Sequence, residues 1–235
     1  MATVVLAHGA WSSAWAWKKV RPLMREAGHE FYTPSYTGLG ERAHLADPSN
    51  DLETHIQDVL GVIEAEDLRD FVLLGHSYGG MVATGVADRA RDRVKHLIYL
   101  DAFVPKDGQS LADLMPPALA QHMTAGMPAG EWRVPPNPPS QDTSPEDLAW
   151  ITAHRKPQSI KCFVSPLKLR NGPITVPRSY IQAMRYAAQG PFSQFAQAAK
   201  SDKGWTSYEI DASHSPNITA PKALVELLNK VIATA

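Results

Sequence analysis

The stretch that decides the fold spans residues 71–83 and reads Phe-Val-Leu-Leu-Gly-His-Ser-Tyr-Gly-Gly-Met-Val-Ala. Its first four residues are apolar and predict a buried strand. The pattern Gly-x-Ser-x-Gly follows at Gly75, Ser77 and Gly79, and an apolar run of small residues over 81–87 predicts a buried helix. A strand, a sharp turn with serine at its tip, and a helix form the setting that a serine nucleophile needs.

The same five-residue pattern also occurs in ordinary glycine- and serine-rich turns, so its position matters. Here it lies between a buried strand and a buried helix, which favours the nucleophile. Glycines flank Ser77 because a strained turn leaves no room for neighbouring Cβ atoms. The helix that begins behind Ser77 is expected to point free N–H groups and its positive dipole end at the reacting centre.

Composition excludes several classes of function. The chain has 235 residues, of which 44% are hydrophobic and 20% charged, with a net charge of −1, as in ordinary soluble globular proteins. A charge so close to zero argues against a nucleic-acid or anionic-membrane partner, because both require a basic surface. Cys162 is the single cysteine, so we expect a buried apolar residue there, and no Cys/His spacing resembles a metal site. We expect no metal and no cofactor.

The first residues also carry information. Residues 3–9 predict a buried strand that begins close to Met1, and no basic segment followed by a removable apolar stretch and a cleavage site precedes it. No apolar run approaches the length of a membrane span. We therefore expect a cytoplasmic protein without a membrane partner.

Strands and helices alternate along most of the chain, which predicts an α/β fold with a mostly parallel sheet and helices on both faces. In such sheets the reactive crevice lies beyond the carboxyl ends of the strands. Strands are expected at 4–7, 30–34, 71–74, 94–100, 179–184 and 205–210, and helices at 17–27, 51–63, 81–87 and from 219 onward.

The character of the sequence changes between residues 105 and 177. Prolines cluster there, and helical segments are expected only at 111–122 and 145–154. Residues 135–140 alone would fit a disordered linker, but the aromatic residues around them favour a packed cap. We predict a core formed by residues 1–104 and 178–235, with residues 105–177 inserted as a lid.

Several motifs together resemble the α/β-hydrolase superfamily. They are the turn His-Gly-Ala-Trp at 8–11, the serine turn at 75–80, the segment Tyr-Leu-Asp-Ala-Phe-Val-Pro at 99–105, and His214 before the last helix. The turn at 8–11 further resembles the branch that contains bacterial carboxylesterases, plant methyl-ester esterases and plant hydroxynitrile lyases. The resemblance covers nearly the whole chain and implies a serine carboxylic-ester hydrolase. The apolar, proline-rich lid favours small to medium hydrophobic esters over peptides.

The resemblance also implies roles for individual residues. Ser77 is the expected nucleophile and His214 the expected base, because His214 follows the last predicted strand and this fold orders its residues as serine, acid, histidine. His8 and His76 sit inside the turn motifs, where we expect them to support loops by hydrogen bonding. The remaining histidines match no motif.

The acid departs from the usual pattern. Most relatives carry it after the strand expected at 179–184, but residues 185–189 read Arg-Tyr-Ala-Ala-Gln. Asp101 ends the preceding strand, where some α/β-hydrolases, certain dehalogenases and lipases among them, place the acid. We predict Asp101, whose alternative role is to cap the strand-end turn. Asp211, shortly before His214, is the second candidate.

Ester cleavage also needs donors for an oxyanion and a pocket for the substrate. We expect the donors to be the backbone N–H groups of Tyr78 and Ala10, with Trp11 as the alternative to Ala10. An apolar pocket is expected under the lid, although residues of this kind more often serve ordinary packing than contact with a ligand. The candidates are Trp11, Phe103, Met115, Leu119, Trp132, Phe163, Val164 and Leu167.

Two other functions remain open on this fold. Relatives that are hydroxynitrile lyases carry threonine beside the oxyanion loop and lysine directly after the catalytic histidine, whereas this chain has Ala10 and Ser215 there. The lyase is therefore less favoured than the esterase. A non-catalytic small-molecule binding protein is the other alternative, since a fold does not determine a function.

Overall fold

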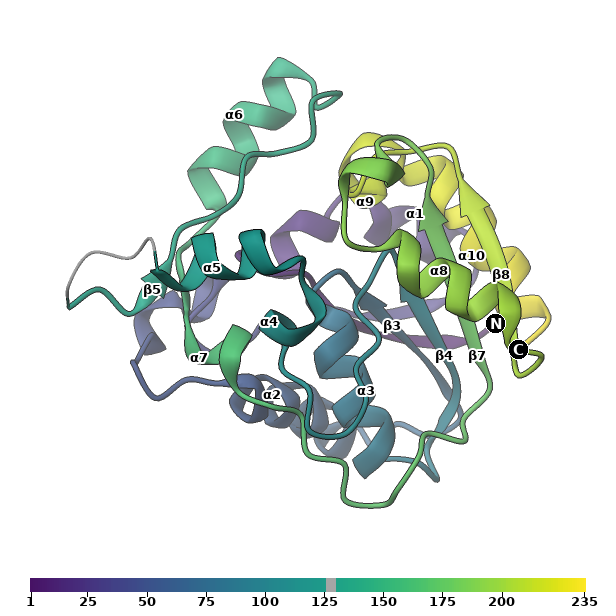
Figure 1. The fold of residues 1–235 in the computed structure, drawn as a ribbon. Helices are drawn as coiled ribbons and strands as arrows, with labels where there is room; N and C mark the ends of the chain where they lie inside the picture. Colours follow the sequence, from purple (N-terminus) through teal and green to yellow (C-terminus); the bar gives the residue numbers. More distant parts are fainter. Residues whose placement is uncertain (126–129) are drawn as a thin grey trace.

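A six-stranded parallel sheet forms the centre of the computed structural model, which describes residues 1–125 and 130–235 (Figure 1). The strands lie in the order β2-β1-β3-β4-β7-β8, and every neighbouring pair is parallel. The predicted α/β-hydrolase architecture is confirmed. The strands are β1 (Thr3–Ala7), β2 (Glu30–Tyr32), β3 (Phe71–His76), β4 (Val94–Leu100), β7 (Arg178–Ala183) and β8 (Trp205–Ile210).

The pairing of β1 with β3 places the two predicted turn motifs next to each other. Every residue of β3 is buried, as the continuous apolar run predicts for a strand covered on both faces. Ala7 pairs with Gly75 at the end of the ladder. The turn that follows β1 and the serine turn that follows β3 therefore leave the sheet side by side.

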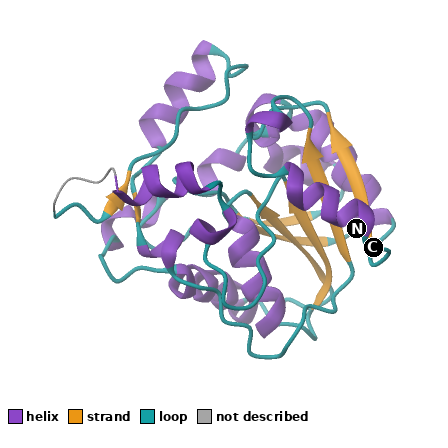
Figure 2. Ribbon diagram, in the orientation of Figure 1, coloured by secondary structure: helices purple, strands orange, loops and turns teal. Residues whose placement is uncertain are grey.

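Helices cover both faces of this sheet (Figures 1 and 2). One apolar cluster joins the sheet to α2 (Leu52–Ala65), α3 (Gly79–Arg89) and α8 (Ser193–Ser201). A second cluster joins the opposite face to α1 (Val20–Glu26) and α10 (Pro221–Ala233). Each face thus has its own core, and the sheet separates the two.

Helix α2 begins as predicted. The Asp51 side chain accepts a hydrogen bond from the Thr54 N–H at 2.9 Å, and the Thr54 hydroxyl reaches back to the Asp51 N–H. This capping box satisfies N–H groups that the first turn of a helix leaves free. The expected apolar face of the helix is buried at Ile56, Val59, Leu60 and Ile63.

The chain between β4 and β7 forms an insertion of short elements. The helix expected at 145–154 is confirmed as α6, but the one expected at 111–122 is divided at Pro116 and Pro117, because proline lacks an N–H and its ring clashes with the preceding turn. Figure 2 shows the two short strands of the insertion away from the main sheet. Its elements are α4 (Leu111–Leu114), α5 (Pro117–Ala125), β5 (Arg133–Val134), α6 (Pro145–His154), β6 (Gln158–Ser159) and α7 (Lys161–Val164).

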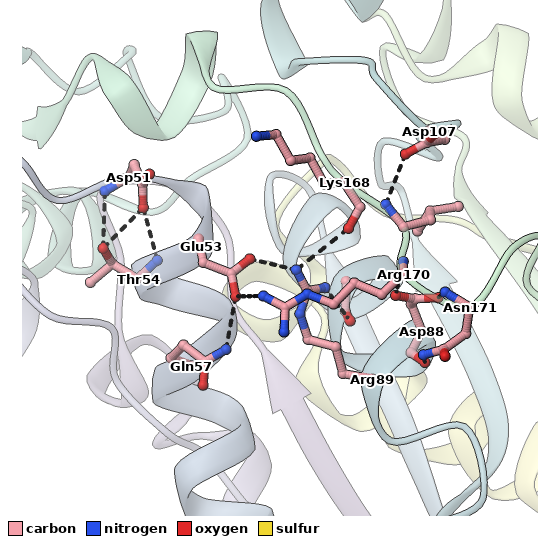
Figure 3. A network of polar contacts seen from close by, with 12 residues as sticks. Asp51, Glu53, Thr54, Gln57, Asp88, Arg89, Asp107, Lys168, Arg170 and Asn171 are labelled. Carbon is pink, nitrogen blue, oxygen red and sulfur yellow. Dashed lines mark hydrogen bonds and ion pairs between the residues drawn. The ribbon is translucent and has the colours of Figure 1, made fainter.

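Polar contacts hold the end of the insertion against the core (Figure 3). Asp88, at the end of α3, accepts hydrogen bonds from the N–H groups of Arg170 at 2.7 Å and Asn171 at 3.0 Å. Glu53 of α2 pairs with the guanidinium groups of Arg89 and Arg170. The chain is therefore tied to α2 and α3 before it enters β7, although the division into a core and a lid stays a prediction.

Several short elements were not predicted from the sequence. Helix α8 is among them, and short helical segments occur at η1 (Ala14–Trp17), η2 (Gly40–Leu45), η3 (Ala187–Gln189) and α9 (Pro216–Thr219). Within the described ranges, no helix combines the length and the apolar composition needed to cross a membrane.

Candidate active site

Ser77 lies at the tip of a tight turn between β3 and α3. Its φ angle is +57°, a conformation that side chains other than glycine rarely adopt. A Cβ atom on Gly75 would lie 2.9 Å from the Ala83 Cβ, and one on Gly79 would clash with the Ala7 carbonyl oxygen. The glycines of the motif are therefore required by close packing around the turn.

Ser77, His214 and Asp101 form one hydrogen-bonded chain. The Ser77 Oγ and the His214 Nε2 are 2.9 Å apart, and the His214 Nδ1 and the Asp101 Oδ2 are 2.7 Å apart. Since the carboxylate only accepts, the Nδ1 carries the proton and the Nε2 is free to accept the proton of the serine hydroxyl. The three residues follow the ends of β3, β4 and β8, as predicted for this edge of the sheet.

Asp101 is held firmly at the end of β4. Its side chain is 7% exposed, and the Oδ1 accepts the N–H of Ala183 at 3.3 Å. The second candidate, Asp211, points into solvent with 83% of its side chain exposed and pairs with Arg185 at 2.9 Å. That ion pair lowers the pKa of Asp211. Of the two candidate acids, the one that contacts His214 is thus Asp101.

Two aromatic neighbours fix the position of His214. The Phe192 ring stacks on the imidazole with centroids 4.6 Å apart and planes 8° apart. The His76 Nε2 donates to the His214 carbonyl oxygen at 2.7 Å, and burial lowers the pKa of His76 to about 3, so its ring is neutral. His76 supports the loop as expected. Phe192 was missed because its segment, before α8, carries no motif.

The N–H groups of Ala10 and Tyr78 are available as oxyanion donors. Neither has an acceptor in the described part of the chain, and both residues line the cavity that contains Ser77. The Trp11 N–H, in contrast, donates to the Gln158 Oε1 at 2.9 Å. Gln158 therefore already accepts the hydrogen bond of the alternative donor, the Trp11 N–H. Among the described residues, the N–H groups of Ala10 and Tyr78 are the two that stay free.

A buried polar cluster lies behind Tyr78. The Tyr78 hydroxyl donates to the His55 Nδ1 at 2.9 Å, while the His55 Nε2 donates to the Thr37 carbonyl oxygen at 3.2 Å. Burial lowers the pKa of His55 to about 3 and raises that of Cys162 to about 12, so both are neutral. Cys162 is 1% exposed, which confirms it as a buried residue.

His8 supports the turn that follows β1. Its Nδ1 donates to the Gly9 carbonyl oxygen at 2.8 Å, and its Nε2 accepts the Tyr36 N–H at 3.3 Å. The Tyr36 hydroxyl in turn donates to the His8 carbonyl oxygen at 3.0 Å. Burial lowers the pKa of His8 to about 4, so this histidine is also neutral and structural.

Ser77 and His214 open into a cavity of about 730 Å³, with the insertion forming much of its wall. Five of the expected pocket residues line it: Trp11, Phe103, Met115, Leu119 and Phe163. The other three do not: Leu167 is buried in the core, Val164 is 38% exposed at the surface, and Trp132 lies under the Arg133 guanidinium, 5.2 Å from its ring.

No group of three or more His, Cys, Asp or Glu side chains within residues 1–125 and 130–235 is arranged to hold a metal ion. The charged side chains that line the cavity itself are Glu131, Arg133 and Arg155. Ser77, His214 and the backbone N–H groups of Ala10 and Tyr78 lie at the same cavity.

Comparisons with known proteins agree with this fold. Residues 4–227 match the model of the alpha/beta hydrolase family. The chain is 40% identical over 239 residues to the carbendazim hydrolyzing esterase of Nocardioides sp. (strain SG-4G), covering 97% of this chain and 98% of that protein. It is 25% identical to methylesterase 17 of Arabidopsis thaliana, over 96% and 90% of the two chains. Among solved structures, an extracellular alpha/beta-hydrolase from a Paenibacillus species superposes with a TM-score of 0.86 at 28% identity, over 98% of both chains.

Proposed function

This chain belongs to the alpha/beta hydrolase family and is a carboxylic-ester hydrolase, and we propose that it cleaves small to medium hydrophobic esters through an acyl-enzyme formed on Ser77. The observation that carries the proposal is the chain of hydrogen bonds from the Ser77 Oγ through His214 to Asp101, at 2.9 and 2.7 Å. A serine hydroxyl becomes a strong nucleophile only when a base takes its proton.

In the first half of the reaction the Ser77 Oγ attacks the ester carbonyl carbon while its proton passes to the His214 Nε2. Asp101 keeps the imidazole in the required tautomer and stabilises the imidazolium that forms. The negative charge that develops on the carbonyl oxygen is met by the N–H groups of Ala10 and Tyr78. The tetrahedral intermediate then expels the alkoxide, which leaves as an alcohol with the proton from His214.

In the second half, water hydrolyses the acyl-enzyme. His214 removes a proton from water, and the resulting hydroxide attacks the carbonyl carbon of the acyl group on Ser77. The C–O bond to Ser77 breaks, the Oγ recovers its proton from His214, and a carboxylic acid is released. The reaction consumes one water for each ester, and these steps call for no group beyond the side chains and N–H donors of the chain.

The lining of the cavity supports the proposed substrate range. Its volume of about 730 Å³ lies within the range of small-molecule sites, and Trp11, Phe103 and Phe163 give it apolar walls. Because the relative that is 40% identical is named for hydrolysing carbendazim, we propose carbendazim as one of the first compounds to be tested.

Hydrolysis of p-nitrophenyl acetate and butyrate tests the mechanism. We expect a burst of p-nitrophenol followed by steady turnover, and a loss of at least about 10³-fold in kcat for Ser77→Ala. Ser201→Ala removes an exposed hydroxyl on α8 and should keep the wild-type rate. A serine-reactive phosphonate should modify Ser77 alone in mass spectrometry. Full activity in Ser77→Ala would contradict the mechanism.

A mandelonitrile assay and the labelling of Ser77 separate the two alternatives. The release of cyanide from mandelonitrile would indicate a lyase, which Ala10 and Ser215 disfavour by the resemblance. Labelling of Ser77 in a single turnover without release of the acyl group would indicate a binding protein. We expect neither result.

A further inference from the structure

One charged side chain in the wall of the cavity has no acidic partner. Arg155 lines the same cavity as Ser77, and its Nη1 donates to the Asn137 carbonyl oxygen at 2.6 Å. Across residues 1–125 and 130–235, no carboxylate forms an ion pair with it. The other two lining charges, Glu131 and Arg133, pair with each other at 3.3 Å. Arg155 therefore carries the uncompensated charge of this wall.

The charge on Arg155 is costly where it stands. The side chain is half-buried, and burial lowers the pKa of its guanidinium, although arginine stays protonated at neutral pH. The same positive charge also contributes to the lowered pKa of His76, which lies beneath His214. A guanidinium has five N–H donors, and one carbonyl oxygen does not satisfy them. An anion in the cavity would complete the pairing.

The residues on both sides of Arg155 contact the wall of the site. The preceding residue, His154, packs against Trp15 with ring centroids 5.2 Å apart. The following residue, Lys156, donates its N–H to the Trp11 carbonyl oxygen at 3.4 Å. Trp11 directly follows the proposed oxyanion donor Ala10. Arg155 is thus held on the wall that contains the oxyanion turn, and its position is fixed before a substrate binds.

We propose that Arg155 binds a carboxylate of the substrate, so that the preferred substrates are esters that carry a free carboxylate at the far end of an apolar chain. A planar guanidinium pairs with a carboxylate through two parallel hydrogen bonds, and its donors match this group better than a neutral one. The apolar walls at Trp11 and Phe163 accommodate the chain between the two ends. The inference rests on the proposed function, because Ser77 must cleave the ester.

The test compares two esters that differ only in charge. Monomethyl adipate carries a carboxylate, and methyl adipamate carries a neutral amide of the same shape. We expect wild-type kcat/KM to favour the acid by about 10- to 100-fold, mainly through KM, as for other charge-assisted hydrogen bonds. Arg155→Gln should reduce this ratio to near 1, and Arg155→Lys should retain part of it, since a lysine keeps the charge without the planar fork.

Lys156 offers a matched control. It is the next residue, it is exposed, and it does not line the cavity. Lys156→Gln removes the same charge from the same segment and should keep the wild-type preference within about 2-fold. An equal loss of preference in Lys156→Gln and Arg155→Gln would overturn the inference, because it would indicate a general electrostatic effect.

A second pair places the charge on the alcohol side of the ester, with ω-acetoxyhexanoate compared with ω-acetoxyhexanamide. A preference for the acid in either pair supports the inference. A wild-type ratio of kcat/KM between acid and amide near 1 in both pairs overturns it, and this result does not depend on whether the Arg155 variants fold. If the wild type hydrolyses p-nitrophenyl acetate but does not prefer the acid in either pair of esters, the proposed function stays intact. If the wild type does not hydrolyse p-nitrophenyl acetate, the proposed function itself is contradicted.

Discussion

At the scale of single residues, the site depends on backbone conformations that are rarely adopted. Trp11, Ser77 and Asp101 have φ angles of +57°, +57° and +42°. Such conformations cost roughly 1–3 kcal/mol each and persist only where the surroundings enforce them. Here the sheet does so, because the Ser77 N–H donates to the Leu100 carbonyl oxygen at 3.3 Å and the Asp101 N–H to that of Ile181 at 2.8 Å.

The contact between Asp101 and His214 leads to a prediction about catalysis. Asp101→Asn should lower kcat for p-nitrophenyl esters by about 10³- to 10⁴-fold, because an amide no longer holds the imidazole in the tautomer that accepts the serine proton. Burst kinetics measure the acylation step directly. Thermal melts of the variant show whether the fold is retained.

Asp211→Asn is the control for this prediction. Its carboxylate is exposed and bonds to Arg185 instead of His214, so kcat should stay within about 2-fold of the wild type. A large loss in Asp211→Asn together with an active Asp101→Asn would reverse the assignment of the acid.

The site residues that could be predicted from the sequence are those marked by a local motif or by their order along the chain. Ser77 has a motif, and His214 and Asp101 follow from the order of strands along the chain. Gln158 and Phe192 could not be found this way, because they reach the site from elements far away in the sequence and no pattern marks them. The pocket residues were only partly predictable, since an apolar residue near a cavity and one in the core have the same sequence character.

At the scale of elements, the site depends on how closely α3 approaches the sheet. The first turn of α3 packs backbone against backbone, with Gly79 beside the Ala7 carbonyl and Gly80 beside that of Phe103. This approach brings the N–H of Tyr78 to the turn after β1. The start of the helix thereby positions the proposed nucleophile Ser77 together with Tyr78, one of the two proposed oxyanion donors.

We therefore expect Gly79→Ala to be strongly destabilising. A Cβ atom there would clash with the Ala7 carbonyl oxygen, and backbone cannot yield as a flexible side chain can, so the free energy of unfolding should fall by about 3 kcal/mol or more. Urea denaturation followed by circular dichroism gives this value. A soluble, active Gly79→Ala protein with unchanged stability would show that the turn tolerates the added atom.

Gly61→Ala is the control for Gly79→Ala, because it makes the same substitution at a position with free space. Gly61 lies inside α2, and a Cβ atom there would meet nothing within 4 Å. The substitution should raise the free energy of unfolding by about 0.5–1 kcal/mol, because alanine loses less backbone entropy than glycine in a helix.

The elements that could be predicted are those with a clear hydrophobic period. Helix α2 repeats large apolar residues on one face, β3 begins with four apolar residues, and β4 is apolar from Leu97 to Leu100. Helix α8 was missed because its buried residues are the small side chains Ala196 and Ala199, which do not stand out as apolar positions among the polar residues around them. In the insertion α6 was predicted, but the two-residue strands β5 and β6 and the four-residue helix α7 are too short to show a hydrophobic period.

At the scale of the whole molecule, three neutral histidines are buried around the active site. His8, His55 and His76 are hydrogen-bonded to backbone carbonyl groups, and burial lowers their pKa from the ordinary value of 6.5 to about 4, 3 and 3. Their burial makes the free energy of unfolding depend on pH, because each histidine gains a proton when the chain unfolds in mild acid.

The free energy of unfolding should fall as the pH drops below about 6.5. Between that value and about 4, the unfolded chain binds protons at all three positions while the folded protein binds almost none. Each histidine then contributes about 1.4 kcal/mol of lost stability per pH unit. Their contribution is fully present above pH 6.5 and is lost toward acid, which urea denaturation at closely spaced pH values measures.

The variant His55→Gln isolates one of these protons. Glutamine can accept from the Tyr78 hydroxyl and donate to the Thr37 carbonyl, so the slope of stability against pH should become shallower by about 1.4 kcal/mol per pH unit. Ile63→Val on the same helix lowers stability by removing one buried methyl group and should leave the slope unchanged. Because a loss of packing shifts the whole curve and a lost proton site changes its slope, equal slopes in His55→Gln and wild type would exclude His55 as a source of the acid sensitivity.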